Sequence, residues 1–140
     1  MVRLKVNATW KGGNRFIAEA DGLGPVTMEW GKGKANFGPM DILLAALAGC
    51  TGIDIVDILT KMKERISTVD VSVDGHRREE YPQIYDRIDV KYVVYGQNIS
   101  REKAERAVEL SVEKYCSVSA MLDEKVKLTH SLDIHESAAE

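Results

Sequence analysis

The sequence has little of the chemistry that small proteins use to reinforce an insufficient core. Only two of its 140 residues are cysteine and only three are histidine. Two cysteines cannot form the dense disulfide framework of a small secreted scaffold, and a chain of this length buries roughly 68% of its unfolded surface in one ordinary core. We therefore expect residues 1–140 to fold as a single domain without disulfides or a structural metal ion.

The sequence also has no large excess of charge of one sign. The 19 basic and 22 acidic side chains give a formal net charge of −3, and neither sign forms a long block. A protein that binds the phosphate backbone of a nucleic acid concentrates basic residues on one face. The composition therefore argues against nucleic acid as a partner.

Long hydrophobic runs are absent as well. The longest, Ile42–Cys50, is far shorter than the roughly 20 residues that span a bilayer. The start, MVRLKVNATW, alternates polar and apolar residues and has no apolar core followed by a small-residue cleavage site, which predicts a strand rather than a signal peptide. We expect a cytoplasmic protein without a membrane partner, in which the cysteines are held reduced.

The residues that are present follow the pattern of an α+β domain. Alternation of apolar residues predicts strands at 4–10, 15–20, 26–30, 69–73, 88–94 and 126–134. Helical periodicity predicts one helix from Pro39 to about Arg65 and another from its N-cap, Ser100, to about Tyr115. The first half of the long helix is apolar on every side, which predicts burial all round. We expect antiparallel sheets with both helices on one face, and a frayed tail at 136–140.

Cys50 lies in the middle of the long predicted helix, close to Gly49 and Gly52. A free cysteine often behaves as a small buried hydrophobe, so core packing is one interpretation. Glycines inside a helix cost roughly 1 kcal/mol each against alanine and usually stay where something approaches the backbone. The two glycines therefore favour a second interpretation, in which a ligand or another helix lies against this part of the helix.

Cys116 closes the second predicted helix in the stretch EKYCSVSAML. A helix C-terminus carries partial negative charge, which disfavours a thiolate. SVSAML contains neither Gly nor Pro, so the chain can instead restart as a short helical turn at 117–122, whose free N–H groups stabilise a sulfur anion on Cys116. Two thiols on helices that share a sheet face suggest a redox pair, provided that their Cα atoms lie within about 7 Å.

Two stretches, GPMDILLAALAGCTGIDIV and ERAVELSVEKYCSVSAML, resemble the cysteine motifs of the OsmC/Ohr family of thiol-dependent organic hydroperoxide reductases, and in particular its YhfA-type branch of short OsmC-like proteins. The resemblance runs from about Arg15 to Ile134. It implies an OsmC-like fold with two central helices and an intertwined homodimer in which the N-terminal β-hairpin region, 1–37, is exchanged. It also implies that Cys50 is the peroxidatic thiol and Cys116 the resolving thiol, without a cofactor, and that a dithiol reductant resets the pair.

The same resemblance implies an arginine that activates the Cys50 thiolate and is itself held by a carboxylate. Arg15 matches the N-terminal arginine of the family, and Arg77 and Arg78 are alternatives. A cation of this kind is needed because Cys50 is in mid-helix, where no free N–H group of its own helix stabilises the thiolate.

The carboxylate differs from the pattern of the hydroperoxide reductases. They place a glutamate directly after the proline that begins the central helix, and this chain has Met40 there. The YhfA-type branch places its acid one position later, which makes Asp41 the candidate to hold the arginine. An acid in the first helical turn also has an ordinary interpretation, as a favourable charge at the helix N-terminus.

Other polar residues have weaker claims to a function. His76, His130 and His135 lack zinc-type spacing, and His130 is expected to be an ordinary packed or half-exposed strand residue. Ser119 is interpreted as a turn residue, because no paired base is identifiable. The lysines of GKGKANFGP and the charges of HRREE are expected in solvated loops.

Two functions of different classes follow from these residues. The first is a dimeric thiol peroxidase that acts on organic hydroperoxides. The second is a non-catalytic protein of the same fold that binds a small apolar or thiol-containing ligand in a pocket at the dimer interface. A thiol–disulfide oxidoreductase is disfavoured because no CxxC motif is present. Whether the Cys50 sulfur is ionised near neutral pH distinguishes the peroxidase from the ligand-binding protein, because peroxidase chemistry requires a thiolate.

Overall fold

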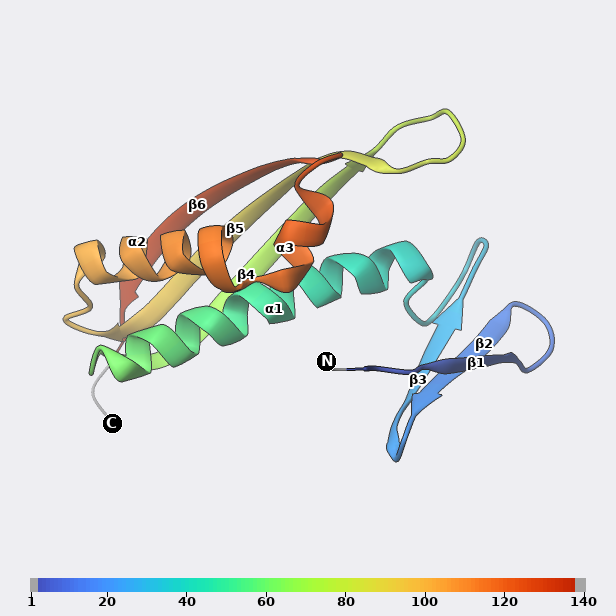
Figure 1. The fold of residues 1–140 in the computed structure, drawn as a ribbon, viewed down its shortest axis with the longest axis horizontal. Coiled ribbons are helices and arrows are strands. Elements are labelled where there is room, and N and C mark those ends of the chain that lie inside the picture. Colours follow the sequence, from blue (N-terminus) through green and yellow to red (C-terminus); the bar gives the residue numbers. More distant parts are fainter. Residues whose placement is uncertain (1–2, 138–140) are drawn as a thin grey trace. The chain divides into compact units, whose positions relative to one another are not determined.

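The computed structural model describes residues 3–137, and the chain divides into two compact units, residues 1–43 and 44–140. Figure 1 shows the order of the helices and strands along the chain. The boundary falls within the long helix α1 (Pro39–Lys61), so the first turn of α1 belongs to the first unit and the rest to the second.

The first unit contains a three-stranded antiparallel sheet. Its strands, hydrogen-bonded in this order, are β1 (Asn7–Trp10), β2 (Arg15–Ala20) and β3 (Leu23–Glu29). Gly12 and Gly13, with φ of 93° and 57°, form the turn between β1 and β2, a conformation that favours glycine. β3 begins ahead of Pro25, earlier than predicted, because β3 is an edge strand in this sheet and an edge tolerates proline.

The second unit is built on a mixed sheet. Its strands, again in hydrogen-bonded order, are β4 (Arg65–Arg77), β5 (Tyr85–Gln97) and β6 (Lys127–Glu136). β4 is antiparallel to β5, but β6 is parallel to β5, so the prediction of antiparallel sheets is wrong for β6. The reason is the connection, because a helical crossover after β5 brings the next strand back in the same direction.

β6 also extends beyond its predicted end at Ile134. His135 and Glu136 pair with Tyr95 and Gly96 of β5, so the first residue of the predicted frayed tail belongs to the sheet. Ser137, the next residue of that predicted tail, donates its N–H to Gly96 O at 2.9 Å, and residues 138–140 lie outside the described residues.

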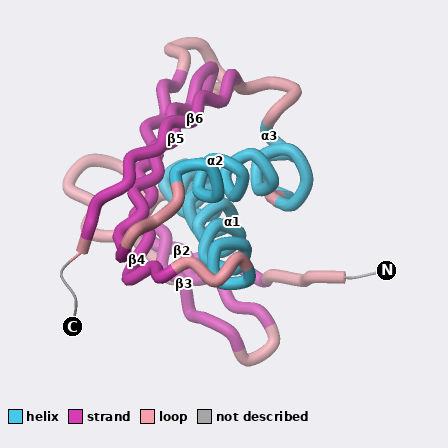
Figure 2. The backbone as a smooth tube through the Cα atoms, turned by 90° about the vertical axis from the view of Figure 1, so that its left-hand side faces the viewer, coloured by secondary structure: helices cyan, strands magenta, loops and turns pink. Residues whose placement is uncertain are grey.

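The helices of the second unit cover one face of its sheet. After β5 the chain forms α2 (Arg101–Leu110), the π-helical turn η1 (Ser111–Tyr115) and α3 (Ser117–Leu122). Figures 1 and 2 show α1 and α2 on the same side of the sheet, as the sequence predicts. Ser100 caps α2 by accepting a hydrogen bond from Lys103 N at 3.2 Å, and Lys63, with a φ of 61°, follows the end of α1.

The core lies between these helices and the sheet. The fully buried side chains come from α1, β5, α2 and η1: Leu47, Thr51, Ile55, Leu59, Ile88, Val90, Tyr92, Val94, Ala104, Ala107 and Ser111. On α1 they recur every fourth residue, and on β5 they fall on alternate residues, which are the periods of a helix face and a strand face. One face of α1 is therefore fixed against the sheet.

The opposite face of α1 is apolar but uncovered within one chain. Among the described residues α1 is the one helix whose length and mean hydropathy of 2.0 would suffice to cross a membrane, a property that core helices of soluble proteins share. Ile53 is 70% exposed and Val56 42% exposed, and they line a groove of about 620 Å³ with Gly49, Gly52 and Val71. The prediction of burial all round concerns the first half of α1, where Ala45, Ala46 and Gly49 are exposed, so this prediction is wrong for a single chain.

Candidate functional site

The two cysteines lie side by side in the second unit. Cys50 is on α1, and Cys116 is at the junction of η1 and α3. The two sulfur atoms and one carboxylate oxygen of Asp54 all lie within 4.8 Å of one another. Both thiols are free, so a pair that is 66 positions apart in the sequence is brought within reach of a disulfide by small movements.

Cys116 caps the short helix that follows it, which is one of the two possibilities that the sequence leaves open. Its backbone leaves the helical conformation, with φ −74° and ψ 103°, and its Sγ accepts a hydrogen bond from Ser119 N at 3.3 Å. The widened π turn before it is closed by Cys116 N, which donates to Ser111 O at 2.7 Å. The extra residue in this turn and the restart at 117 together direct the sulfur of Cys116 toward α1.

The two thiols differ in their environments. Cys116 is 3% exposed, whereas Cys50 is half-buried. Burial raises the pKa of the Cys116 thiol, and this effect exceeds the lowering by the Ser119 hydrogen bonds, while the neighbouring Cys50 raises it further. Cys116 is therefore held as a neutral thiol, and Cys50 is the sulfur that an external molecule can reach.

Asp54 belongs to this site although the sequence analysis does not select it. It lies one helical turn after Cys50, and its Oδ2 accepts a hydrogen bond from Ser111 Oγ at 2.9 Å. Ser111 is fully buried and belongs to η1, so its hydrogen bond fixes the Asp54 carboxylate to the π-helical turn. The available signal in the sequence is an acid four residues after a cysteine in the apolar stretch CTGIDIV, which places both on one face of a helix. Two sulfurs and a carboxylate oxygen at these separations could together hold a soft divalent metal ion.

A second cluster of possible metal ligands, Asp74, His76 and Asp89, lies on the sheet. Arg87 already pairs with Asp89 at 2.8 Å, and His76 Nε2 lies 3.2 Å from the same carboxylate. The guanidinium of Arg87 already neutralises Asp89, and its hydrogen bond, together with those of Thr129 and His76, holds the pKa of Asp89 well below its usual range. We interpret this cluster as an ion-paired surface network.

Arg15, the predicted activator of Cys50, lies in the first unit. Its Nη2 is 3.4 Å from Glu29 Oε1. Glu29 is buried and also accepts hydrogen bonds from Asn36 Nδ2 at 2.6 Å and from Ala35 N at 2.9 Å, and these hold its pKa below the usual range, with Arg15 contributing further. Glu29 is therefore a carboxylate partner of Arg15 that sequence reasoning missed, because Glu29 precedes the helix region to which the family pattern points.

Asp41, the predicted partner of the arginine, lies in the first turn of α1 and makes contacts that are typical of an acid at a helix N-terminus. Its Oδ2 accepts a hydrogen bond from Gly38 N at 2.8 Å and pairs with the ammonium group of Lys34. Lys34 is thus drawn from its loop onto the first turn of α1. The role of Asp41 in holding Arg15, and that of Arg15 at Cys50, stay predictions.

The alternative arginines fix a loop of the second unit. Arg77 Nε donates to Gln83 O at 2.7 Å, and Arg78 Nε donates to Pro82 O at 2.7 Å. Both contacts close the connection from β4 to β5 and give each guanidinium group a structural partner.

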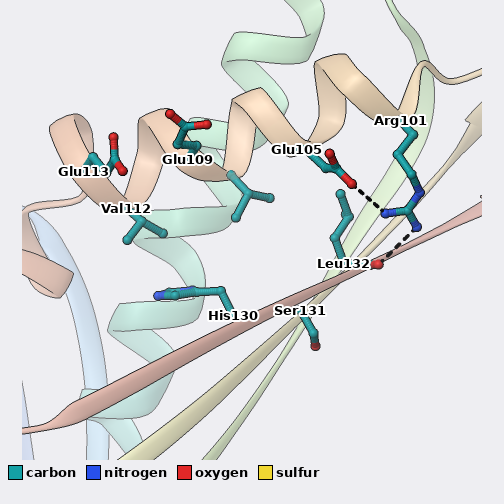
Figure 3. A pocket seen from close by; sticks show the side chains of 9 residues that line it. Arg101, Glu105, Glu109, Val112, Glu113, His130, Ser131 and Leu132 are labelled. Carbon is teal, nitrogen blue, oxygen red and sulfur yellow. Dashed lines mark hydrogen bonds and ion pairs between the residues drawn. The ribbon is translucent and has the colours of Figure 1, made fainter.

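A cavity of about 350 Å³ lies between α2, η1 and β6 (Figure 3). Arg101 closes one end by pairing with Glu105 at 3.1 Å and donating to Leu132 O at 3.3 Å. His130 lines the cavity, shares a 2.8 Å hydrogen bond with Tyr92 OH through Nδ1, and has a buried Nε2 without a partner among residues 3–137. Burial lowers the pKa of His130, so the imidazole is neutral, and this half-buried strand residue matches the prediction.

Comparison with known proteins identifies relatives along most of the chain. A family model described as OsmC-like protein matches residues 31–131. Protein YhfA of Escherichia coli strain K12 is 34% identical over 131 residues, which cover 94% of this chain and 98% of YhfA.

Solved structures agree in fold. A crystal structure of a hypothetical protein from Aquifex aeolicus is 30% identical with a TM-score of 0.90, covering 99% of this chain and all of that chain. The organic hydroperoxide resistance protein OhrB of Bacillus subtilis is 22% identical with a TM-score of 0.65, covering 94% of this chain and 98% of OhrB. The latter likeness concerns the fold alone.

Two neighbouring thiols on helices that cover one mixed sheet define a dithiol protein of the α+β class. Both cysteine motifs fall inside residues 31–131, the region that the family model covers, so the match includes the two thiols. The chain belongs to the OsmC/Ohr family of OsmC-like proteins. The predicted family and the predicted α+β, OsmC-like fold are thereby confirmed.

Proposed function

We propose that this protein is a thiol peroxidase that reduces organic hydroperoxides to alcohols with Cys50 and Cys116. The observation that supports this most is the pair of sulfurs within 4.8 Å of each other, one half-buried and one fully buried. The likeness in fold to a protein named for organic hydroperoxide resistance is consistent with it.

The proposed reaction uses each thiol once. The Cys50 thiolate attacks the distal oxygen of the hydroperoxide, the O–O bond breaks, and the alkoxide leaves as an alcohol after taking a proton. Cys50 is then a sulfenic acid, and Cys116 attacks its sulfur, forming a disulfide and releasing water. An external dithiol reduces this disulfide by exchange, which restores both thiols and fits a reducing compartment such as the cytoplasm.

The burial of Cys116 suits the second step. A protonated, shielded thiol does not compete with Cys50 for the hydroperoxide. It reacts only with a sulfenic acid formed beside it, so the pair does not need two accessible sulfurs.

Counting free thiols tests the proposal. One equivalent of cumene hydroperoxide is added to the reduced protein, and the remaining thiols are alkylated and counted by mass spectrometry. We expect rapid loss of both thiols with a mass decrease of about 2 Da, the two hydrogens lost when a disulfide forms. If both thiols are still alkylated after prolonged exposure, the peroxidase proposal fails and the alternative of a ligand-binding protein takes its place.

Arg15 is the proposed source of the positive charge that favours the Cys50 thiolate, and we expect Arg15→Ala to slow reaction with cumene hydroperoxide about 100-fold, as removal of one preorganised charge typically does. Stopped-flow measurement of thiol oxidation gives this rate. Lys11→Ala, on an exposed turn residue, is the matched control and should leave the rate unchanged. Equal rates for Arg15→Ala and the wild type would remove Arg15 from the mechanism.

The same assay identifies the carboxylate that serves Arg15. Glu29→Gln removes the charge that faces the guanidinium at 3.4 Å, whereas Asp41→Asn removes the predicted family acid. A rate loss in the first variant alone would assign the role to Glu29, and a loss in the second alone would assign it to Asp41.

The proposed assembly is a homodimer in which the uncovered face of α1 is buried. Ile53 and Val56 expose apolar surface along the groove beside Gly49, at the level of Cys50 on the same helix. Burial of such surface against a second copy is favourable, and the family resemblance implies the same arrangement. Sedimentation of the reduced protein at its monomer mass of 15.6 kDa would contradict this assembly.

A further inference from the structure

The position of Asp54 is not explained by peroxidase chemistry. A carboxylate beside a sulfur disfavours the thiolate, because like charges repel most strongly in a partly desolvated site. Yet Asp54 lies within 4.8 Å of both sulfurs and is held there by Ser111 Oγ at 2.9 Å. Together with the two sulfurs, the fixed carboxylate offers three ligand atoms to a single cation.

We propose that the reduced protein binds one thiophilic divalent cation of the zinc class through Cys50 Sγ, Cys116 Sγ and a carboxylate oxygen of Asp54. Zinc binds sulfur at about 2.3 Å and carboxylate oxygen at about 2.0–2.2 Å, so ligand atoms of one ion are separated by less than about 4.6 Å. The three atoms are already within 4.8 Å of one another. In a tetrahedral site the ligand atoms lie about 3.5–3.8 Å apart, so side-chain rotations that move them by no more than about 1 Å bring them to this geometry.

The surroundings of the ligand atoms match those of bound metal ions. Ser111 fixes Oδ2 of Asp54, and Ser119 N donates to the sulfur of Cys116 at 3.3 Å. Such hydrogen bonds orient ligands and offset part of the negative charge on a coordinating thiolate. Because Cys50 is half-buried, the fourth position of a tetrahedral ion can be taken by solvent.

Binding at this site has a definite proton balance. Both thiols must lose their protons to become ligands, so each bound ion releases two protons when both were protonated. Two neutral thiols and one carboxylate carry a net charge of −1 before binding, and two thiolates, one carboxylate and one divalent ion carry the same −1 afterwards. The ion therefore replaces the two thiol protons without changing the charge of the site.

The site needs only the reduced thiols, but its regulation rests on the proposed function. The disulfide and the metal complex use the same two sulfurs, so they exclude each other. Oxidation of the pair by a hydroperoxide would release the ion, and a bound ion would protect the thiols from the hydroperoxide.

The test is a titration of the reduced full chain with Cd²⁺, whose thiolate complexes absorb in the ultraviolet. We expect saturation at one ion per chain, release of two protons to a pH indicator, and displacement of Cd²⁺ by Zn²⁺. This absorption reports only sulfur-bound ions, so ions at the exposed Asp74, His76 and Asp89 cluster do not contribute. Absence of saturable absorption would overturn the proposal.

Two variants separate ligation from structure. Asp54→Asn should weaken Cd²⁺ binding by more than about 100-fold, since loss of a ligand exceeds the 10- to 100-fold effect of outer residues. The same variant should speed alkylation of Cys50 by iodoacetamide, because a repelling charge is removed. Asp57→Asn, on an exposed residue of the same helix that pairs with Lys61, is the control and should change neither.

Opposite changes in metal affinity and thiol reactivity identify Asp54 as a ligand. Unchanged Cd²⁺ affinity in Asp54→Asn would overturn its role. Failure of this proposal is distinguishable from failure of the proposed function. A chain that forms a disulfide with hydroperoxide but binds no Cd²⁺ lacks only the metal site, and a chain that binds Cd²⁺ but keeps both thiols after hydroperoxide lacks only the peroxidase.

Discussion

Cys50→Ser is expected to lower turnover of cumene hydroperoxide by at least about a thousandfold, because a serine hydroxyl in place of the attacking sulfur removes the nucleophile itself. Cys116→Ser should behave differently and reduce one equivalent of hydroperoxide per chain before stopping. Cys50 then stays a sulfenic acid, since the neighbouring thiol that would form the disulfide is missing. Single-turnover kinetics and trapping of the sulfenic acid with dimedone measure both results.

The difference in burial is the reason for this asymmetry. Cys116 is 3% exposed and its thiol is kept neutral by burial, whereas Cys50 is half-buried and accessible. Ser67→Ala, which changes an exposed hydroxyl at the edge of the sheet, is a suitable control and should keep full turnover. If Cys50→Ser forms the trapped sulfenic acid and Cys116→Ser is inert, the two roles are reversed.

The position of Cys116 shows how far local sequence chemistry reaches. The stretch SVSAML lacks Gly and Pro, which allows a helical restart after Cys116 without deciding for it, and the structure has α3 over these residues. The π-helical turn before it was beyond prediction, because an extra residue in one turn depends on the packing of Ser111 and Cys116 against α1 rather than on local propensity. That turn brings the two sulfurs together.

The acidic residues near the thiols and Arg15 follow less directly from the sequence than the thiols do. Asp54 follows Cys50 by one turn, but a sequence pattern does not say what lies opposite a helix face, and only the fold brings Cys116 and Ser111 to it. Glu29 is fixed by the loop after β3, which brings Ala35 and Asn36 back to donate hydrogen bonds to its carboxylate. Contacts of this kind join residues through tertiary structure, so periodicity cannot predict them.

Strand directions illustrate the same limit. Alternation of apolar residues in β4 and β5 predicts two strands with one buried face, and both are confirmed. The same alternation in β6 is compatible with either direction. The crossover through α2 and α3 decides for the parallel pairing with β5, and this is a property of the chain path rather than of the strand.

Tyr92 should make folding stability depend on pH in the alkaline range. It is fully buried on β5, and its hydroxyl is bonded to His130 Nδ1 at 2.8 Å. Burial raises the pKa of Tyr92 from 10.0 to about 12, partly opposed by a hydrogen bond with Thr51. The folded protein therefore keeps this proton at pH values where the unfolded chain has lost it.

The sign follows from this difference in proton affinity. Below pH 10 both states hold the proton, and the neutral hydroxyl contributes its full stability. As the pH rises from 10 to about 12, ionisation stabilises the unfolded chain alone, so the free energy of unfolding falls by roughly 3 kcal/mol in total. Urea unfolding at a series of pH values from about 9 to 12 measures this loss, with intact secondary structure checked at each pH.

Tyr92→Phe isolates the contribution, because phenylalanine keeps the ring and lacks the ionisable group. The variant should be less stable than the wild type near pH 9, where His130 has lost its partner, and the two curves should converge as the pH rises toward 12. Tyr81→Phe is the control, since Tyr81 is 87% exposed and its loss should leave the alkaline slope unchanged. A constant difference between wild type and Tyr92→Phe from pH 10 to 12 would show that the buried hydroxyl ionises as readily in the folded protein as in the unfolded chain.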